Sequence, residues 1–134
     1  MTFPSYHFIE GVAAPISPSC HAVELDGWVF LTGQIARDLA NPDAPLPEGI
    51  ELQTERTLRN IEYILSKLGL SFRNMLSARV FLTDFPNDYG GMNTTYAKVI
   101  GEAKPARTCV GVTHIARGAK IEIDCIARRA QVDR

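Results

Sequence analysis

Cysteine and histidine are scarce in this sequence, and neither residue is clustered. The three cysteines, Cys20, Cys109 and Cys125, are widely separated among 134 residues and form no Cys-x-x-Cys pair. An odd number of thiols at this spacing indicates neither a disulfide framework nor a zinc ribbon, so we expect reduced thiols. No two of the three histidines have the four-residue spacing that places two metal ligands on one helical face. The sequence therefore predicts no metal site.

The chain also lacks a marked excess of either charge and any long apolar run. Its net charge of -1 provides no electrostatic attraction for nucleic acid, which argues against a general RNA-binding role. No run approaches the roughly 18 apolar residues of a membrane span. The N-terminus, Met1-Thr2-Phe3-Pro4, lacks a basic region followed by an apolar core. We expect a cytoplasmic protein with no membrane partner, folded as a single domain over residues 1–134.

The first half of the chain contains a hairpin and a loop. Residues 19–26 and 28–35 are rich in β-forming residues and are joined by Asp26-Gly27, a dipeptide that favours a tight turn. They are predicted to pair in antiparallel fashion. Three prolines between residues 38 and 49 prevent a helix or a central strand from continuing, so this segment is predicted to be an exposed loop.

Two helices are predicted on either side of a third strand. In residues 51–68 apolar side chains recur at three- and four-residue steps, which is typical of an amphipathic helix, and Gly69 follows where a left-handed cap would end it. Residues 75–83 alternate, which predicts a strand whose inner face carries the apolar residues Leu76, Ala78, Val80 and Leu82.

The second helix is expected to begin at Asn87 or Asp88, because either residue can cap it, and to end at Gly101. Its apolar stripe is predicted to contain Tyr89, Met92, Tyr96 and Val99.

Two further strands, in residues 104–112 and 119–127, carry the residues of greatest chemical interest. Alternation places Arg107, Cys109 and Gly111 on one side of the first strand. In the second strand it places Glu122 and Asp124 opposite an apolar face. The order of elements, two strands, helix, strand, helix and two strands, predicts an α+β fold in which two helices cover one face of a mixed sheet.

Each candidate residue has an ordinary alternative role. The planar guanidinium of Arg107 can bind a carboxylate through two hydrogen bonds, but most arginines are solvated on the surface. Glu122 can position or deprotonate a water molecule, or be a solvated strand residue. Cys109 has no base nearby in sequence, so it is predicted to line a pocket rather than act as a nucleophile. Gly33 within a strand indicates either a bulge or the close approach of a ligand to the backbone.

The segment Pro105-Ala106-Arg107-Thr108-Cys109-Val110, followed by residues 120–127, resembles the C-terminal signature of the RidA family, also called YjgF or UK114. The resemblance extends backwards over most of the chain. It includes four further motifs in the family's order: Thr32-Gly33-Gln34, Gln53-Thr54 leading to Asn60, residues 80–84, and Asp88-Tyr89 with Met92-Asn93-Thr94-Thr95-Tyr96.

This resemblance implies a chorismate-mutase-like fold, assembled as a homotrimer with ligand clefts between subunits. It implies hydrolysis of reactive enamines or imines, the 2-imino acids, to 2-keto acids and ammonia without a cofactor. Alternatives are an endoribonuclease and a non-catalytic sensor of small carboxylates.

The resemblance also implies roles for individual residues. Arg107 anchors the substrate carboxylate and Glu122 orients water, while Cys109 lines the pocket. Thr32 and Gly33 supply backbone groups. Asn93 is expected in the pocket or at an interface, and Tyr89 as an aromatic wall.

One position departs from the family pattern. Members commonly have a tyrosine over the active site where this chain has Ser19, within Ser17-Pro18-Ser19-Cys20-His21. The smaller Ser19 is expected to widen the binding pocket unless Tyr6, Phe8 or Trp28, or a neighbouring subunit, fills the space. His21 adds a side chain that can titrate near neutral pH.

Overall fold

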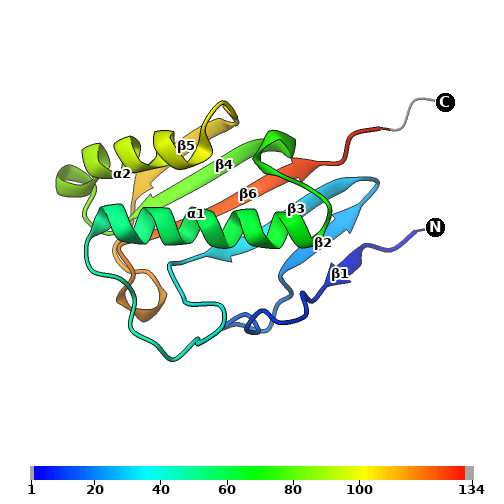
Figure 1. Cartoon of the computed structure of the whole chain (residues 1–134), viewed down its shortest axis with the longest axis horizontal. Coiled ribbons are helices and arrows are strands. Elements are labelled where there is room, and N and C mark those ends of the chain that lie inside the picture. Colours follow the sequence, from blue (N-terminus) through cyan, green and yellow to red (C-terminus); the bar gives the residue numbers. More distant parts are fainter. Residues whose placement is uncertain (1, 132–134) are drawn as a thin grey trace.

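Among the described residues, six strands form one mixed sheet, and two helices lie side by side across one of its faces (Figure 1). The computed structural model describes residues 2–131. The strand order is β1-β2-β3-β6-β4-β5, in which β5 runs parallel to β4 and all other neighbours are antiparallel. The predicted α+β architecture is therefore confirmed. Along the chain the elements are β1 (Ser5–His7), β2 (Ala22–Leu25), β3 (Trp28–Gln34), α1 (Ile50–Lys67), β4 (Met75–Leu82), α2 (Phe85–Ile100), β5 (Ala106–Gly111) and β6 (Ile121–Arg128), with short 3₁₀ turns at Phe72–Asn74 and Ala116–Gly118.

The predicted hairpin is formed by β2 and β3. Asp26 and Gly27 both have positive φ, 53° and 80°, so Leu25 pairs with Trp28 directly across the turn. Strand β2 begins at Ala22, three residues later than predicted. Immediately before it, the carbonyl oxygens of Cys20 and His21 accept bonds from the Thr32 hydroxyl and amide.

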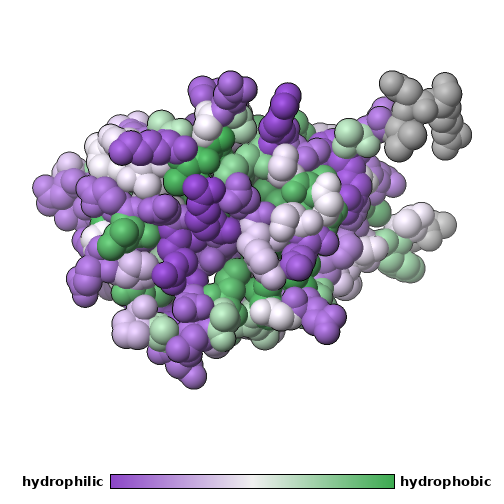
Figure 2. Space-filling view, viewed as in Figure 1, coloured by the Kyte–Doolittle hydropathy of each residue, from purple (hydrophilic) through white to green (hydrophobic). Residues whose placement is uncertain are grey.

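Helix α1 confirms the periodicity of residues 51–68. Leu58, Ile61 and Leu65 are fully buried against the sheet, and the helix ends before Gly69, whose φ of 75° suits glycine. The outer surface of α1 is covered mainly by hydrophilic side chains (Figure 2). Residues 38–49 form the predicted loop, and Arg117 holds it by donating to the carbonyl oxygens of Pro42 and Ala44.

A bulge at the start of β4 changes which residue enters the core. Met75 pairs with Ala127, but Ser77 pairs with the adjacent Ile126, so β4 has one extra residue at this point. Met75 is buried and Leu76 is 47% exposed. The prediction that Leu76 shares the inner face with the other apolar residues of β4 was therefore wrong, because the bulge breaks the alternation.

Helix α2 begins at Phe85, earlier than predicted. Asp84 is its N-cap residue, and Asn87 donates to the Asp84 carboxylate instead of capping the helix itself. Pro86 fits the first turn because the amide hydrogen that proline lacks has no intrahelical partner there. The buried stripe consists of Asp88, Met92, Tyr96 and Ile100. Tyr89 lies outside it and is 38% exposed, so its placement in the core stripe was wrong.

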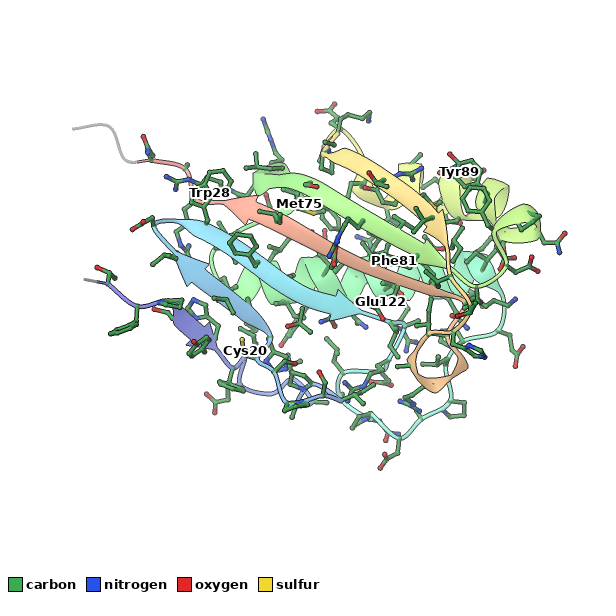
Figure 3. All side chains as sticks on the ribbon, turned by 180° about the vertical axis from the view of Figure 1, so that it is seen from behind. Cys20, Trp28, Met75, Phe81, Tyr89 and Glu122 are labelled. Atoms are coloured by element: carbon green, nitrogen blue, oxygen red, sulfur yellow. The ribbon has the colours of Figure 1, made fainter. Side chains whose placement is uncertain are left out.

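No helix formed by residues 2–131 covers the opposite face of the sheet, as the view from behind shows (Figure 3). Apolar side chains are exposed there, including Trp28 at 43% and Phe30 at 45%. Strands β5 and β6 are not neighbours, because β4 lies between them. Neither helix within residues 2–131 combines the length and apolar character needed to cross a membrane.

The two consecutive glycines of α2 provide a matched test of helix packing. A Cβ on Gly90 would meet no atom within 4 Å, whereas one on Gly91 would lie 2.6 Å from the Glu51 carboxylate and 3.1 Å from Cγ2 of Ile50. We predict that Gly90→Ala raises the free energy of unfolding by about 0.8–1 kcal/mol through helix propensity. Gly91→Ala should stabilise the protein less, because Ile50 and Glu51 of α1 would have to shift to make room for the added methyl group. Chemical denaturation of both variants checks this, and equal stabilisation would contradict the close α1–α2 contact.

Candidate functional site

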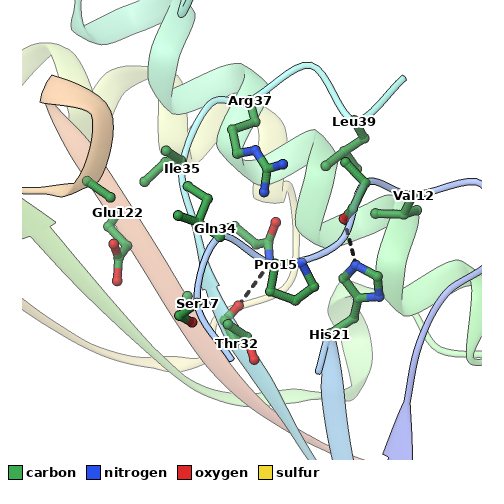
Figure 4. Close-up of a pocket in the computed structure, with 14 residues that line it drawn as sticks. Val12, Pro15, Ser17, His21, Thr32, Gln34, Ile35, Arg37, Leu39 and Glu122 are labelled. Atoms are coloured by element: carbon green, nitrogen blue, oxygen red, sulfur yellow. Dashed lines mark hydrogen bonds between the residues drawn. The ribbon is translucent and has the colours of Figure 1, made fainter. Parts of the chain in front are cut away.

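Glu122 lies near the start of β6 and faces a cavity of about 210 Å³ (Figure 4). Its neighbours Ile121 and Ile123 are fully buried beneath the helices, so alternation directs Glu122 to the opposite face of the sheet. The cavity is also lined by Thr32, Gly33 and Gln34 of β3, and by residues of the segment between β1 and β2.

Gly33 allows the Glu122 side chain to lie directly against the backbone of β3. A Cβ at position 33 would lie 2.5 Å from a Glu122 carboxylate oxygen and 3.1 Å from its carboxyl carbon. The pairing of β3 with β6 shifts between Leu31 and Gln34, so a bulge is present at the same point. Both interpretations of Gly33, a bulge and a close approach, thus apply, although the approaching group is a side chain of this chain.

The environment of Glu122 alters its acidity. Burial is the main cause that raises the pKa of this carboxyl above its ordinary value, and the negative charge of Asp124 adds to the effect. Asp124 itself accepts two hydrogen bonds from Arg79, of 3.0 and 2.6 Å. Glu122 therefore keeps its proton to a higher pH than a solvated glutamate and is a stronger base once ionised.

Side-chain hydrogen bonds hold the bulged segment of β3. The Thr32 hydroxyl donates to the carbonyl oxygen of Cys20 over 2.6 Å, and Gln34 Nε2 donates to the Thr32 carbonyl oxygen over 3.0 Å. The hydroxyl of Thr32 thus already has an acceptor within the chain. The bulge is fixed at the point where it meets Glu122.

His21 lines the cavity but is built into the backbone. Its Nδ1 accepts from the Ile9 amide and its Nε2 donates to the Ala13 carbonyl oxygen, both over 2.8 Å, and the residue is only 4% exposed. Nδ1 is thus the acceptor and Nε2 the donor, so backbone groups occupy both ring nitrogens and hold the ring in the wall of the cavity.

Ser19 lies in a neighbouring groove rather than beside Glu122. It is exposed, and its hydroxyl lies 3.0 Å from that of Ser17, which does line the Glu122 cavity. The groove of Ser19 is also lined by Tyr6 and Phe8, two of the residues considered as replacements for the family's tyrosine. Thr32 borders both spaces.

Arg107 lies on β5 and points beneath α2. Its Nη2 donates to Asn93 Oδ1 over 2.7 Å, its Nη1 lies 3.6 Å from Met92 Sδ, and the guanidinium lies over the Tyr96 ring at 4.8 Å from the centroid. Asn93 thus orients the guanidinium directly. Since a guanidinium has five donors, part of its hydrogen-bonding capacity remains for a ligand.

Cys109 and Tyr89 flank this second cluster. Cys109 shares a face of β5 with Arg107, and burial raises the pKa of its thiol, while the positive charge of Arg107 opposes the shift. The thiol therefore stays protonated at neutral pH, which suits a lining role rather than that of a nucleophile. Tyr89 lies one helical turn before Asn93 and stacks on Phe85 with ring centroids 4.6 Å apart.

The candidate residues form two clusters on opposite faces of the sheet. Arg107 pairs with Ala78 of β4, which is buried beneath the helices, whereas Glu122 pairs with Phe81, whose side chain points to the open face. The structure brings Arg107, Asn93 and Cys109 together, and it brings Glu122 together with Thr32 and Gly33. Within one chain the two clusters do not meet, because β4 separates their strands and their side chains point in opposite directions.

Some residues near the candidate site did not stand out in the sequence. Tyr96 was assigned only to a core stripe, yet its ring also supports Arg107. Arg37 lines the Glu122 cavity. The one signal for Arg37 is its place directly after Ile35 and Ala36, two buried residues that follow β3. Among residues 2–131, no group of three or more His, Cys, Asp or Glu side chains has an arrangement suited to a metal ion.

Comparisons with known proteins cover nearly the whole chain. Among curated relatives, a 2-iminobutanoate/2-iminopropanoate deaminase of Mus musculus is 32% identical over 114 residues, which is 85% of this chain and 83% of the mouse protein. A RutC family protein of Pyrococcus horikoshii is 36% identical over 120 residues, covering 90% of this chain and 94% of the relative.

Solved structures agree with these relatives. The YjgF gene product of E. coli superimposes with a TM-score of 0.85 at 29% identity, covering 94% of this chain and 99% of that one. E. coli TdcF with bound serine has the same TM-score, identity and coverage. Residues 11–129 match the family described as Endoribonuclease L-PSP. The chain therefore belongs to the Endoribonuclease L-PSP family, which is the family of the RidA and YjgF proteins.

Proposed function

We propose that this protein hydrolyses 2-imino acids, in equilibrium with their enamines, to 2-keto acids and ammonia. The observation that carries the proposal is the half-buried Glu122 carboxylate, which lies against Gly33 and faces a small cavity. The 32% identity to a mouse protein named 2-iminobutanoate/2-iminopropanoate deaminase supports the same reaction.

The reaction needs a base and a positioned substrate, but no nucleophilic side chain. An ionised Glu122 accepts a proton from water as the water oxygen adds to the imine carbon. Addition to the protonated imine gives a neutral carbinolamine. Glu122 returns its proton to the carbinolamine nitrogen, the hydroxyl loses its proton to solvent, and the C–N bond breaks to release the 2-keto acid and ammonia. The raised pKa of Glu122 favours the first transfer, since a stronger carboxylate base takes the proton from water more readily.

Arg107 is proposed to bind the substrate carboxylate. Asn93 holds one side of the guanidinium, so the free donors keep a fixed direction for two parallel hydrogen bonds. Fixing the carboxylate restricts the position of the imine carbon, and positioning of this kind supplies a large share of the rate acceleration.

The opposed directions of Arg107 and Glu122 imply that the complete site contains two subunits. We infer a homotrimer in which Arg107 of one chain approaches the Glu122 cavity of the next. The uncovered sheet face supports association, because Trp28, Phe30 and other apolar side chains are exposed on it. Thr32, Gly33, Cys109, Tyr89 and Ser19 are proposed to line or border the resulting cleft.

The family description also names a ribonuclease activity. The net charge of -1 gives this chain no general attraction for the phosphate backbone, so we prefer the small carboxylate substrate.

Arg107→Lys tests the carboxylate anchor. Imines are generated in situ from alanine and leucine by an amino-acid oxidase, and ammonia release above the spontaneous rate is measured. We predict that the wild-type chain accelerates hydrolysis. The variant should lose roughly 10- to 100-fold in kcat/KM, because a point charge cannot reproduce paired hydrogen bonds to a carboxylate. Arg73→Lys, which changes an exposed arginine in the 3₁₀ turn before β4, is the control. Normal turnover by folded Arg107→Lys protein would exclude this anchor.

The pH dependence tests the role of Glu122. If the ionised carboxylate is the active form, kcat/KM falls as the pH drops through its pKa, and this limb should lie above the ordinary glutamate value of 4.5. Asp124→Asn removes a negative neighbour and should move the limb to lower pH. The pH profiles of kcat/KM are measured for both proteins with the same substrate, so the substrate's own ionisation contributes equally to each. Glu102→Gln serves as a control at a distant carboxylate. A limb that Asp124→Asn moves upward would refute the assignment.

Phe30→Glu tests the proposed assembly. A carboxylate introduced into an apolar interface should dissociate the trimer and abolish imine hydrolysis, because an unpaired buried charge costs several kcal/mol. Tyr63→Glu is the matched control, since Tyr63 on α1 is 43% exposed, close to the 45% of Phe30, but lies on the helix side. Light scattering should report three chain masses for the wild type and the control. A wild-type monomer that hydrolyses imines would rule out the shared site.

A further inference from the structure

Arg37 is a second arginine whose hydrogen-bonding capacity is largely unused, and it borders the Glu122 cavity. It follows the buried residues Ile35 and Ala36 at the end of β3. Figure 4 shows its guanidinium directed toward Pro15 and Gln34, among the residues that line the cavity. Its Nη1 donates to the Ala14 carbonyl oxygen over 3.2 Å. Its Nε is buried and has no hydrogen-bond partner among the described residues. A buried donor without a partner costs free energy, so its retention here points to a ligand.

Arg37 also lacks a direct ion-pair partner among the described residues. Burial is the main cause that lowers the pKa of Arg37, and the positive charge of Arg117 adds to it, while Asp43 acts in the opposite sense. Arg117 itself is held by the loop, since its terminal nitrogens donate to the carbonyl oxygens of Pro42 and Ala44. An anionic group in the cavity would relieve the repulsion between the two arginines.

The size and lining of the cavity restrict what this anion can be. Its volume of about 210 Å³ is smaller than the roughly 300–1,000 Å³ of pockets for drug-sized ligands. Val12, Pro15 and Leu39 provide apolar walls. The Nε and the second terminal nitrogen of an arginine form a side-on pair of donors that matches the two oxygens of a carboxylate.

We propose that Arg37 binds a second, side-chain carboxylate of the substrate, so that the preferred substrates are imines of dicarboxylic amino acids. The substrate class rests on the proposed imine hydrolysis, in which Arg107 of a neighbouring subunit takes the carboxylate next to the imine carbon. The subsite for one carboxylate rests on the geometry around Arg37 and does not depend on the reaction. Placing the two carboxylates on two different arginines directs the carbon between them toward Glu122.

The test compares imines generated in situ from aspartate, glutamate and alanine by oxidases that accept each amino acid. The expected result is a higher kcat/KM for the acidic imines in the wild-type protein. Arg37→Gln should reduce the ratio of the acidic to the alanine imine at least tenfold. Arg37→Lys should give an intermediate ratio, because it keeps the charge but not the paired donors. Arg59→Gln removes an exposed arginine paired with Glu62 on α1 and should leave the ratio unchanged.

A second measurement separates this proposal from the proposed reaction. Titration calorimetry of the full chain with succinate and with butyrate should show tighter binding of succinate, and Arg37→Gln should remove the difference. If imines are hydrolysed with equal ratios in wild type and Arg37→Gln, the substrate class is overturned while imine hydrolysis stands. If no imine is hydrolysed but succinate binds through Arg37, the dicarboxylate site stands and the reaction fails.

Equal binding of succinate and butyrate by the wild-type protein would overturn the site itself. This last outcome does not depend on any variant, so it decides the matter even if the Arg37 variants fail to fold. Melting temperatures identify variants that have lost the bond to the Ala14 carbonyl oxygen and the local structure with it.

Discussion

Burial of one face of the sheet beneath α1 and α2 is the constraint on which the rest of this structure depends. Because strand side chains alternate, each residue of β4, β5 and β6 must point either into this core or to the open face. Ile121 and Ile123 occupy the core, which commits Glu122 to the open face. Arg107 is committed to the helix side by its pairing with Ala78. The separation of the two candidate clusters is thus a direct result of core packing.

Two β-bulges and a glycine change which side chains the sheet buries and how closely its strands approach one another. The bulge in β3 and the absence of a side chain at Gly33 admit the Glu122 carboxylate against the backbone, which contributes to its burial and to its raised pKa. The bulge in β4 exchanges Met75 for Leu76 in the core and leaves Leu76 exposed. Both bulges occur where β6 meets a neighbouring strand.

The arginines of this chain differ in how their guanidinium groups are used. Arg107 is braced by Asn93 and Tyr96 and keeps donors free for a ligand. Arg37 borders a cavity that also contains a carboxylate, and its buried Nε has no partner within residues 2–131. Arg117, by contrast, is occupied with holding the loop. Exposed arginines such as Arg59 form ordinary surface pairs.

Local patterns in the sequence were sufficient for much of the fold. The periodicity of α1, the Asp26-Gly27 turn and the alternation in β6 depend on neighbours along the chain, and all three were predicted correctly. The family resemblance rested on short motifs of the same kind. The sequence also placed Arg107 with Cys109, because residues two apart share a strand face.

Tertiary structure alone decided how the candidate residues are combined. No local pattern reveals that β4 inserts between β5 and β6, so the sequence could not show that Arg107 and Glu122 face opposite sides. The occupied ring of His21 and the unpartnered Nε of Arg37 depend on backbone groups contributed by other segments. The start of α2 and the exchange of Met75 for Leu76 depend on capping and strand register. In each case the deciding contact joins residues distant in the chain, or depends on packing that residue types alone do not specify.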